Sequence, residues 1–454
     1  MTDQEAGHSA FARADRRLST KEAAELLGVK PETVYAYVSR GQLSSRRGPG
    51  SRGSTFDPKE VQALALRNRR EPAAASGANE LSVRTRITLI EKDRYYFRGV
   101  DAAALALRHS YEEVAEWLWT GVLRPGIHFT APPEPSGSAR LAVRALPEHC
   151  GPTDRLRVAA IAAGASDPLR FDLSEEAVIG TARTLIPTLV TALPPRLPGH
   201  RDGGPLAGRL WARLSGREPD DASLRALDTA LALLVDHDLA ASTLAVRVAA
   251  SARAHPYAAV SAGLGVLEGP LHGAASGLAH RMLLEVLDRG TAAPVVANEL
   301  RAGRRVPGLG HRVYQGEDPR AQALFGLLER MPKAGPALAA ARDVVATTAR
   351  HTDLHANVDL ALAVLTASSG MAAEAGETVF AVARTAGWIA HALEEYGERP
   401  MRMRPVGQYV GTRPPQPLPE AHGLSDASEV RDASEVPDTP EVPGTTDAPG
   451  SPSR

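Results

Sequence analysis

The sequence predicts a largely α-helical protein that carries a small helix-turn-helix module near its N-terminus. Two observations favour helices for the body of the chain: aromatic residues make up only 4% of its 454 residues, and Ala and Leu abound. This length exceeds one ordinary domain, and an apolar fraction of 43% is sufficient for a large core. A third observation, two short capped segments followed by an Arg-rich loop, predicts the N-terminal module.

Composition excludes several classes of protein. The single cysteine, Cys150, excludes an intramolecular disulfide and a Cys-based zinc cluster. The N-terminal residues have no apolar core of signal-peptide length, and no uncharged run of about 18 apolar residues occurs in the chain. We therefore expect a cytoplasmic protein without a membrane segment.

The N-terminal module is predicted from its helix start and stop signals. The Ser-Thr pair at 19–20 can cap a helix that Gly28 ends, and Pro31 stands in the first turn of a second helix. Two short helices joined by a Gly-containing turn make a helix-turn-helix. The basic, Gly-rich loop 44–53 then stands where a wing would follow.

Residues 18–67 resemble the small winged-helix DNA-binding domains of the excisionase and MerR type. Residues 1–70 carry 13 Lys/Arg against 8 Asp/Glu, a net charge of +5, which suits contact with phosphate. The resemblance implies that the second helix faces the major groove and that the loop meets phosphate. The residues concerned are Thr33, Tyr35, Tyr37 and Arg40 in the helix, and Arg46, Arg47 and Arg52 in the loop. The alternative is a helical module that contacts protein or nothing.

Composition also divides the chain. The segment 71–80 contains Pro72 and an Ala-Ala-Ala-Ser-Gly run, which predicts a linker. Residues 412–454 carry 3 Lys/Arg against 8 Asp/Glu in a degenerate Pro- and Ser-containing repeat, which predicts a disordered acidic tail. The expected organisation is a disordered N-terminus (1–17), the helix-turn-helix module (18–70), the linker (71–80), the body (81–411) and the tail (412–454).

Three stretches of the body have clear local patterns. Val83 to Ile90 alternates apolar and polar residues, which predicts a short strand. Leu224 to Val235 is a strongly apolar helix, with Ser223 placed to cap it, and it delivers Asp236–His237–Asp238 at its end. Another helix, 241–252, follows almost at once. A histidine at such a junction is more often structural than functional.

A later helix, 377–396, contains an arginine in an apolar setting. Arg384 has Phe380 four residues before it and Trp388 four residues after it, so it shares their apolar face. Burying a guanidinium without a partner is costly, so an anion should meet it. A structural Asp or Glu and a ligand carboxylate are equally physical partners.

The motifs that carry chemistry lie in the second half of the chain. Leu267–Ser276 reads LEGPLHGAAS, in which His272 stands between a Gly-Pro turn and a helix over 278–287, and Gly273 permits close approach of a ligand. Gly308–Tyr314 reads GLGHRVY and leads on to Asp318–Pro319–Arg320, and Asn357–Val358–Asp359 follows. In order and spacing these motifs resemble GPLHG, GxGHRVY…DPR and NVD of the citrate synthase family. Further resemblances are DHDLAASTLAVRV at 236–248, ARTAGW at 383–388 and RPxxxYxG at 404–411.

The resemblance implies a Claisen-type condensation of acetyl-CoA with oxaloacetate, followed by thioester hydrolysis to citrate and CoA. The methyl protons of a thioester are very weakly acidic, so their removal requires a base and a group that stabilises the enol oxygen. The resemblance makes Asp359 the base and His272 the hydrogen-bond donor to the thioester oxygen. It makes His311 the donor to the ketone oxygen of oxaloacetate.

The resemblance also implies how the substrates are bound. Oxaloacetate is a dianion, and planar guanidinium groups bind carboxylates bidentately. The residues implied for oxaloacetate are His237, Arg320, Arg384 and Arg404, and those implied for CoA are Leu309, Gly310 and Arg312. The resemblance implies no metal or redox cofactor. Acyl-CoA is a substrate of the reaction and not a cofactor.

In fold terms, the resemblance covers residues 81–411 and implies an all-α citrate synthase fold. It consists of a large helical domain and a smaller one, about 272–372, hinged across a cleft. A homodimer is implied, with Arg404 reaching into the site of the neighbouring subunit. Two departures, Leu360–Ala363 after NVD and Ala274–Ser276 after GPLHG, concern the acyl pocket. The alternative activity is therefore a 2-methylcitrate synthase that uses propionyl-CoA.

Two other function classes compete with this interpretation. His351, His355 and Asp359 are spaced four residues apart, so on one continuous helix they would line a face that suits a divalent metal of a metallohydrolase. HTDLH, however, lacks the glutamate of HExxH. The other competitor is a DNA-binding regulator whose synthase-like body senses a metabolite. Every catalytic position is occupied, which favours the enzyme.

Overall fold

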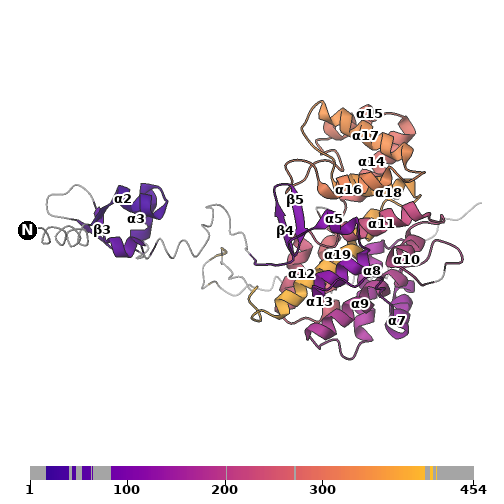
Figure 1. Cartoon of the computed structure of the whole chain (residues 1–454), viewed down its shortest axis with the longest axis horizontal. Coiled ribbons are helices and arrows are strands. Elements are labelled where there is room, and N and C mark those ends of the chain that lie inside the picture. The colour runs from indigo at the N-terminus through magenta and orange to yellow at the C-terminus, as the bar shows by residue number, and fades with distance from the viewer. Residues whose placement is uncertain are drawn as a thin grey trace, which may run out of the picture. The chain divides into compact units, whose positions relative to one another are not determined.

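The computed structural model describes residues 17–39, 43–47, 54–62, 64, 83–200, 202–269, 272–403, 410–412 and 416. The chain forms two compact units that divide between Arg84 and Thr85 (Figure 1). Unit 1 is the N-terminal unit, and unit 2 is the large C-terminal unit. Each has its own hydrophobic core.

Unit 1 is a helix-turn-helix with a small antiparallel sheet. Its elements are β1 (Leu18–Ser19), α2 (Thr20–Leu27), α3 (Pro31–Ser39), β2 (Ser45–Arg47) and β3 (Ser54–Phe56), with strand order β1-β3-β2. Ser19 caps α2, and its side chain and that of Glu22 exchange hydrogen bonds with each other's backbone N–H groups. Gly28 ends α2 in the left-handed conformation, at φ 68°. The predicted cap and stop are therefore confirmed.

The core of unit 1 lies between its two helices and the sheet. Its buried members are Ala23, Ala24, Val34, Leu43, Phe56, Val61 and Leu64. Tyr35 points away from this core and is 52% exposed, whereas Tyr37 packs against it. Tyr37 was predicted to face DNA together with Tyr35, but it packs against the core instead. Side chains two positions apart on a helix project about 200° apart, so the two tyrosines point to opposite sides of α3.

Unit 2 is built almost entirely from helices. A three-stranded antiparallel sheet of β4 (Thr88–Glu91), β5 (Arg94–Phe97) and β6 (Val100–Asp101) precedes them. The helices are α5 (Ala102–Ala106), α6 (Tyr111–Thr120), α7 (Pro133–Arg144), α8 (Pro152–Ala165), α9 (Glu175–Ala192), α10 (Leu206–Leu214), α11 (Asp221–Leu233), α12 (Ala241–Ser251), α13 (Pro256–Leu267), α14 (Ala275–Arg289), α15 (Ala293–Arg301), α16 (Pro319–Leu328), α17 (Gly335–Ala349), α18 (Val358–Ser368) and α19 (Ala375–Tyr396).

Helix α19 is the central element of unit 2. It packs against α9, α12 and α13 and also contacts α14 and α18. Helices α14 to α18 pack on one another and lie together at the top of Figure 1, while α19 runs among the lower helices. Most of α19 is buried, including Trp388, which is inaccessible to solvent. Segments far apart in the sequence are thereby brought to one helix.

Two local predictions for unit 2 were wrong in their boundaries. The strand begins at Thr88 rather than Val83, because its partner β5 ends at Phe97, which pairs with Thr88. Helix α11 is capped by Asp220 rather than Ser223. Asp220 has an extended backbone conformation, and its side chain accepts a hydrogen bond from the Ser223 N–H. The same helix ends at Leu233, so His237 lies in the turn that follows it.

No helix among the described residues is both long enough and apolar enough to span a membrane.

Candidate active site

The described residues that the sequence predicts for catalysis and oxaloacetate binding come from six places in unit 2. They are His237 in the turn between α11 and α12, His272 just before α14, His311 in the loop before α16, Arg320 in the first turn of α16, Asp359 in the first turn of α18 and Arg384 in the middle of α19. Arg404 lies outside the described residues, as do Arg40 and Arg52 of the predicted DNA-binding set. The side chain of Arg47 is likewise not described.

The loop that carries His311 is fixed by the start of α18. Leu309 forms an antiparallel bridge with Ala356, and the Gly310 N–H donates to the His355 carbonyl at 2.8 Å. The Asn357 amide side chain donates to the Gly310 carbonyl, also at 2.8 Å, and its oxygen caps α18. A Cβ on Gly308, whose φ is 79°, would lie 2.8 Å from the Leu360 Cβ. Glycine at 308 is therefore what allows the loop to sit against α18.

Asp318 joins the starts of α16 and α18. Its carboxylate is buried, receives the Arg320 side chain through Nε at 3.0 Å and Nη2 at 2.8 Å, and accepts the Val358 N–H at 3.0 Å. Burial alone would raise the pKa of Asp318, but the Arg320 charge and hydrogen bonds outweigh it and lower the pKa. This carboxylate therefore places Arg320 next to the helix turn that carries Asp359.

Two histidines and a tyrosine meet beside Arg320. His237 Nε2 lies 2.7 Å from the Tyr314 hydroxyl. The His237 and His311 ring centroids are 5.1 Å apart, and those of His311 and Tyr314 are 4.7 Å apart. The Arg320 Cζ lies 5.6 Å from the centre of the Tyr314 ring. Burial and then the Arg320 charge lower the pKa of His237 well below its usual range, so its imidazole is neutral at pH 7.

Both ring nitrogens of His311 face donors. Its Nδ1 lies 3.0 Å from the backbone N of Val313 and 3.4 Å from that of Tyr314, while Nε2 lies 3.1 Å from the Arg320 Nη2. Burial and the Arg320 charge lower the pKa of His311 to about 4, so the ring is neutral at pH 7. A neutral imidazole has only one acceptor nitrogen. One of the two sets of contacts is therefore not a true hydrogen bond.

Arg384 lies on the buried face of α19 that the sequence predicts. It is 1% exposed, and its Cζ lies 4.5 Å from the centre of the Phe380 ring. Its Nε donates to the Leu234 carbonyl at 2.9 Å, while Nη2 has no acceptor among the described residues. Burial lowers its pKa to about 10, and the charge of Asp236 acts in the opposite direction. Arg384 thus has an internal counter-charge and an unused donor.

His272 and Asp359 complete the site. His272 Nε2 lies 2.8 Å from Ser242 Oγ, and burial followed by the Arg384 charge lowers its pKa. Burial raises the pKa of Asp359 to about 6, against the opposing charge of Arg320. Arg384 thus acts electrostatically on His272, and Arg320 acts on Asp359.

The residues predicted to bind CoA differ in solvent exposure and in whether their backbone groups are free. Arg312 is exposed, whereas the Leu309 side chain is buried. The N–H and carbonyl of Gly310 are both used in hydrogen bonds within the chain. Of these residues, Arg312 has the side chain that is open to solvent.

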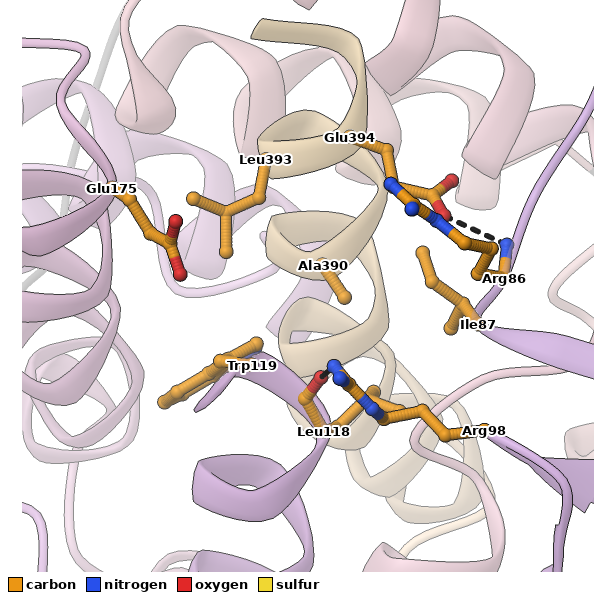
Figure 2. A pocket seen from close by; sticks show the side chains of 9 residues that line it. All are labelled: Arg86, Ile87, Arg98, Leu118, Trp119, Glu175, Ala390, Leu393 and Glu394. Carbon is orange, nitrogen blue, oxygen red and sulfur yellow. Dashed lines mark hydrogen bonds between the residues drawn. The ribbon is translucent and has the colours of Figure 1, made fainter. Parts of the chain in front are cut away.

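A pocket of 510 Å³ lies elsewhere in unit 2 (Figure 2). It is lined by Arg86, Ile87, Arg98, Leu118, Trp119, Glu175, Ala390, Leu393 and Glu394. None of the predicted substrate-binding residues contributes to it.

Comparison with known proteins agrees with this arrangement. The family model described as citrate synthase, C-terminal domain, matches residues 77–406, and one described as a helix-turn-helix domain matches residues 17–69. A citrate synthase from Acidithiobacillus ferridurans is 30% identical over 355 residues, which cover 72% of this chain and 91% of the relative. The chain belongs to the citrate synthase family. It is an enzyme of the citrate synthase type, as predicted.

Further matches are one relative with a different name and two solved structures of citrate synthases. A 2-methylcitrate synthase from Mycobacterium tuberculosis is 28% identical over 69% of this chain and 84% of the relative. The crystal structure of citrate synthase from Thermotoga maritima matches with a TM-score of 0.60 at 27% identity, covering 75% of this chain and 96% of that one. A citrate synthase from Thermoplasma acidophilum matches with a TM-score of 0.63 at 24% identity, over 75% and 96% of the two chains. The predicted all-α citrate synthase fold is confirmed.

The metal-binding alternative required a helix that does not exist in this citrate synthase-family chain. Helix α17 ends at Ala349 and α18 begins at Val358, so His351 and His355 lie in the intervening loop rather than on one helical face with Asp359. The Asn357 cap starts a new helix directly before Asp359, which breaks the assumed spacing. Within the described ranges, no three His, Cys, Asp or Glu side chains are placed to hold a metal ion.

Sequence reasoning assigned no role to several residues that shape this citrate synthase-family site. Asp318 carried a usable signal, since Asp before Pro is a typical helix N-cap followed by proline at the first helical position. Tyr314 and Asp236 stood inside quoted motifs, but nothing local indicated their partners. Ser242 lies in the first turn of α12 and gave no signal, because its partner His272 is 30 residues away.

Proposed function

We propose that the chain condenses acetyl-CoA with oxaloacetate to give citrate and CoA. The observation that carries the proposal is the gathering of three neutral histidines, two buried arginines and a carboxylate of raised pKa in one part of unit 2. The Thermoplasma acidophilum relative is described as a ternary complex with carboxymethyl coenzyme A and oxaloacetate. This supports the same pair of ligand classes here.

Oxaloacetate binds through Arg320, Arg384 and His237. Arg384 offers Nη2, which has no acceptor within the described protein. Arg320 is held rigidly by Asp318, so little side-chain entropy is lost when it meets a carboxylate. Arg404, from the neighbouring subunit of a homodimer, completes the set. Light scattering of the purified protein tests for the dimer: a monomeric mass at assay concentration would remove Arg404 from the site.

Bound oxaloacetate resolves the conflict at His311. The backbone amides of Val313 and Tyr314 donate to Nδ1, so the ring proton lies on Nε2. In the free protein this N–H faces the Arg320 guanidinium, which is also a donor. An oxygen of the ligand placed between them accepts from both. His311 therefore donates to the ketone oxygen as negative charge develops on it.

Asp359 removes the proton and His272 stabilises the enol. A base whose pKa is about 6 is ionised at neutral pH and is still a stronger base than an ordinary carboxylate. In this mechanism the ring proton of His272 lies on Nδ1, for the thioester oxygen, and Nε2 accepts from the Ser242 hydroxyl 2.8 Å away. Attack of the enol carbon on the ketone forms the new carbon–carbon bond. Hydrolysis of the citryl thioester then releases CoA.

One assay tests the activity and the acyl preference. CoA release is measured with oxaloacetate and either acetyl-CoA or propionyl-CoA. Higher kcat/KM with acetyl-CoA supports a citrate synthase, and the reverse supports the 2-methylcitrate synthase alternative. The departures at 274–276 and 360–363 leave the acyl preference open, and the Mycobacterium tuberculosis relative carries the name of that alternative. Binding of both ligands without release of CoA would instead favour the metabolite-sensing regulator.

We propose DNA binding as a second function, carried by unit 1. The helix-turn-helix match covers residues 17–69, and α3 presents Tyr35 to solvent with its hydroxyl 3.4 Å from Thr20 Oγ1. Thr33 is partly exposed on the same helix, and Arg46 is exposed on β2. Each phosphate neutralised adds about −0.9 to the slope of log K against log salt.

A mobility-shift titration against genomic fragments tests this second function. Arg46→Ala with Arg47→Ala should flatten the salt slope, and Lys21→Ala, an exposed cation on α2, is the control. Full-length protein that binds no fragment better than a chain lacking residues 1–78 would refute DNA binding. Turnover of that shortened chain should stay within about threefold of the full chain, because every proposed catalytic residue lies beyond position 230.

A further inference from the structure

Buried ionisable side chains follow one face of α19. Arg384, His391 and Glu395 are separated by seven and four residues, which places them on the same side of the helix. None is more than 1% exposed. Charged residues are almost never buried so deeply unless they are paired. We call these three residues, together with Arg247 and Asp236, the α19 charge chain.

Arg247, on α12, links the outer members of the α19 charge chain. It is 1% exposed, and its Nε donates to Glu395 at 3.2 Å and its Nη1 to His391 Nδ1 at 2.9 Å. Nη1 also donates at 2.8 Å to Glu394, which accepts the Arg86 N–H at 2.7 Å at the wall of the pocket in Figure 2. A guanidinium only donates, so His391 Nδ1 accepts and the ring proton lies on Nε2.

Asp236 links the inner members. His391 Nε2 lies 3.3 Å from one oxygen of the Asp236 carboxylate, and the Thr88 hydroxyl donates to the other at 2.5 Å. Burial would raise the pKa of Asp236, but His391 and then Arg384 outweigh it and the pKa is lowered, so the carboxylate is charged. Asp236 is also the largest stabilising influence on the Arg384 cation.

The backbone is built to bring these groups together. A Cβ on Gly387 would lie 2.2 Å from the Val235 carbonyl and 2.8 Å from the Asp236 carboxylate. Only glycine at 387 lets α19 approach the turn that carries both Asp236 and His237. The charges then alternate along the α19 charge chain, from Glu395 through Arg247 and Asp236 to Arg384. An anion at Arg384 Nη2 continues the alternation.

We propose that Asp236 and His391 are positioning residues for oxaloacetate. Asp236 keeps Arg384 charged and His391 lies against Asp236, which leaves the Arg384 Nη2 to donate to a ligand carboxylate, although neither Asp236 nor His391 touches the ligand. The proposal rests on the proposed function, since it assumes that oxaloacetate is the anion. A purely structural network would instead affect folding and leave the affinity for oxaloacetate unchanged in the folded molecules.

The test compares steady-state kinetics and oxaloacetate calorimetry of full-length variants. Asp236→Asn should raise the oxaloacetate KM about tenfold or more, because it removes the counter-charge of a buried guanidinium. Its kcat and its acyl-CoA KM should stay within about threefold of wild type. Thr88→Val, which removes one hydrogen bond to Asp236, should raise the oxaloacetate KM by about two- to tenfold.

Substitutions at His391 supply a rescue. His391→Gln keeps an acceptor for Arg247 and a donor for Asp236, so its oxaloacetate KM should remain near that of wild type, whereas His391→Leu should raise it. Glu112→Gln is the matched control. Glu112 is also inaccessible to solvent and pairs with a buried arginine, Arg209, at 3.3 Å on α10. It should alter stability without changing the oxaloacetate KM.

The outcomes separate the two proposals. Wild-type protein that binds no oxaloacetate in calorimetry would refute the proposed function and this role with it. Wild-type binding together with an unchanged affinity in Asp236→Asn would refute the positioning role alone. If Asp236→Asn does not fold, Thr88→Val, His391→Leu and His391→Gln decide. The role is overturned if all three keep the wild-type oxaloacetate KM, or if Glu112→Gln changes that KM as much as Thr88→Val and His391→Leu do.

Discussion

Replacing Asp359 by asparagine is expected to stabilise the protein while removing its activity. Burial raises the pKa of Asp359 from 3.8 to about 6. Between these values the folded chain binds more protons than the unfolded chain, so stability falls as pH rises through this window. At pH 7 the ionised carboxylate therefore costs the fold about 3 kcal/mol. The amide removes this cost but cannot accept the proton, so kcat should fall about 100-fold or more.

Urea unfolding at pH 7 and pH 5 measures the stability difference. The gain from Asp359→Asn should shrink to about half at pH 5, where less of the native carboxylate is ionised. Asp353→Asn, which changes an exposed residue of the preceding loop, is the control and should alter stability by less than about 0.5 kcal/mol. A less stable variant at pH 7, or a gain independent of pH, would refute the burial argument.

The activity of Asp359 is tested separately. Wild-type kcat/KM should rise with pH through about 6, and retained turnover in Asp359→Asn would exclude Asp359 as the base.

Three further substitutions probe the site and its support. Arg384→Leu should raise the oxaloacetate KM about 100-fold or more, and an unchanged KM in steady-state kinetics would contradict the ligand role. Ser242→Ala should lower kcat about five- to tenfold, because it releases the ring tautomer of His272, while the oxaloacetate affinity measured by calorimetry stays constant. Gly387→Ala should destabilise the protein by about 2 kcal/mol or more in urea, since a Cβ there meets a backbone carbonyl at 2.2 Å. Gly326→Ala, in α16 with open space around it, should instead stabilise by about 0.5–1 kcal/mol, and a loss at both positions would refute the packing argument.

Local sequence signals determined much of the fold. The serine cap and glycine stop of α2, the apolar face around Arg384 and the helix after His272 all lie where their short-range patterns predict. Such signals depend on contacts within about one or two helical turns, which the sequence encodes directly. The wrong boundaries had non-local or competing causes: the strand start was set by the end of its partner, and the cap of α11 by an aspartate three residues before the predicted serine.

The sequence by itself determined the motif residues that the citrate synthase family resemblance singles out. Only the tertiary structure decided which groups surround them. Thr88 and Asp236 are 148 positions apart, and Arg247 and His391 are 144 positions apart, yet each pair is hydrogen-bonded. The pKa values of Asp359 and His311 follow from burial and from the Arg320 charge, neither of which is visible in a local pattern. The physical reason is that helix packing, not spacing along the chain, sets both the neighbours and the dielectric environment of a buried charge.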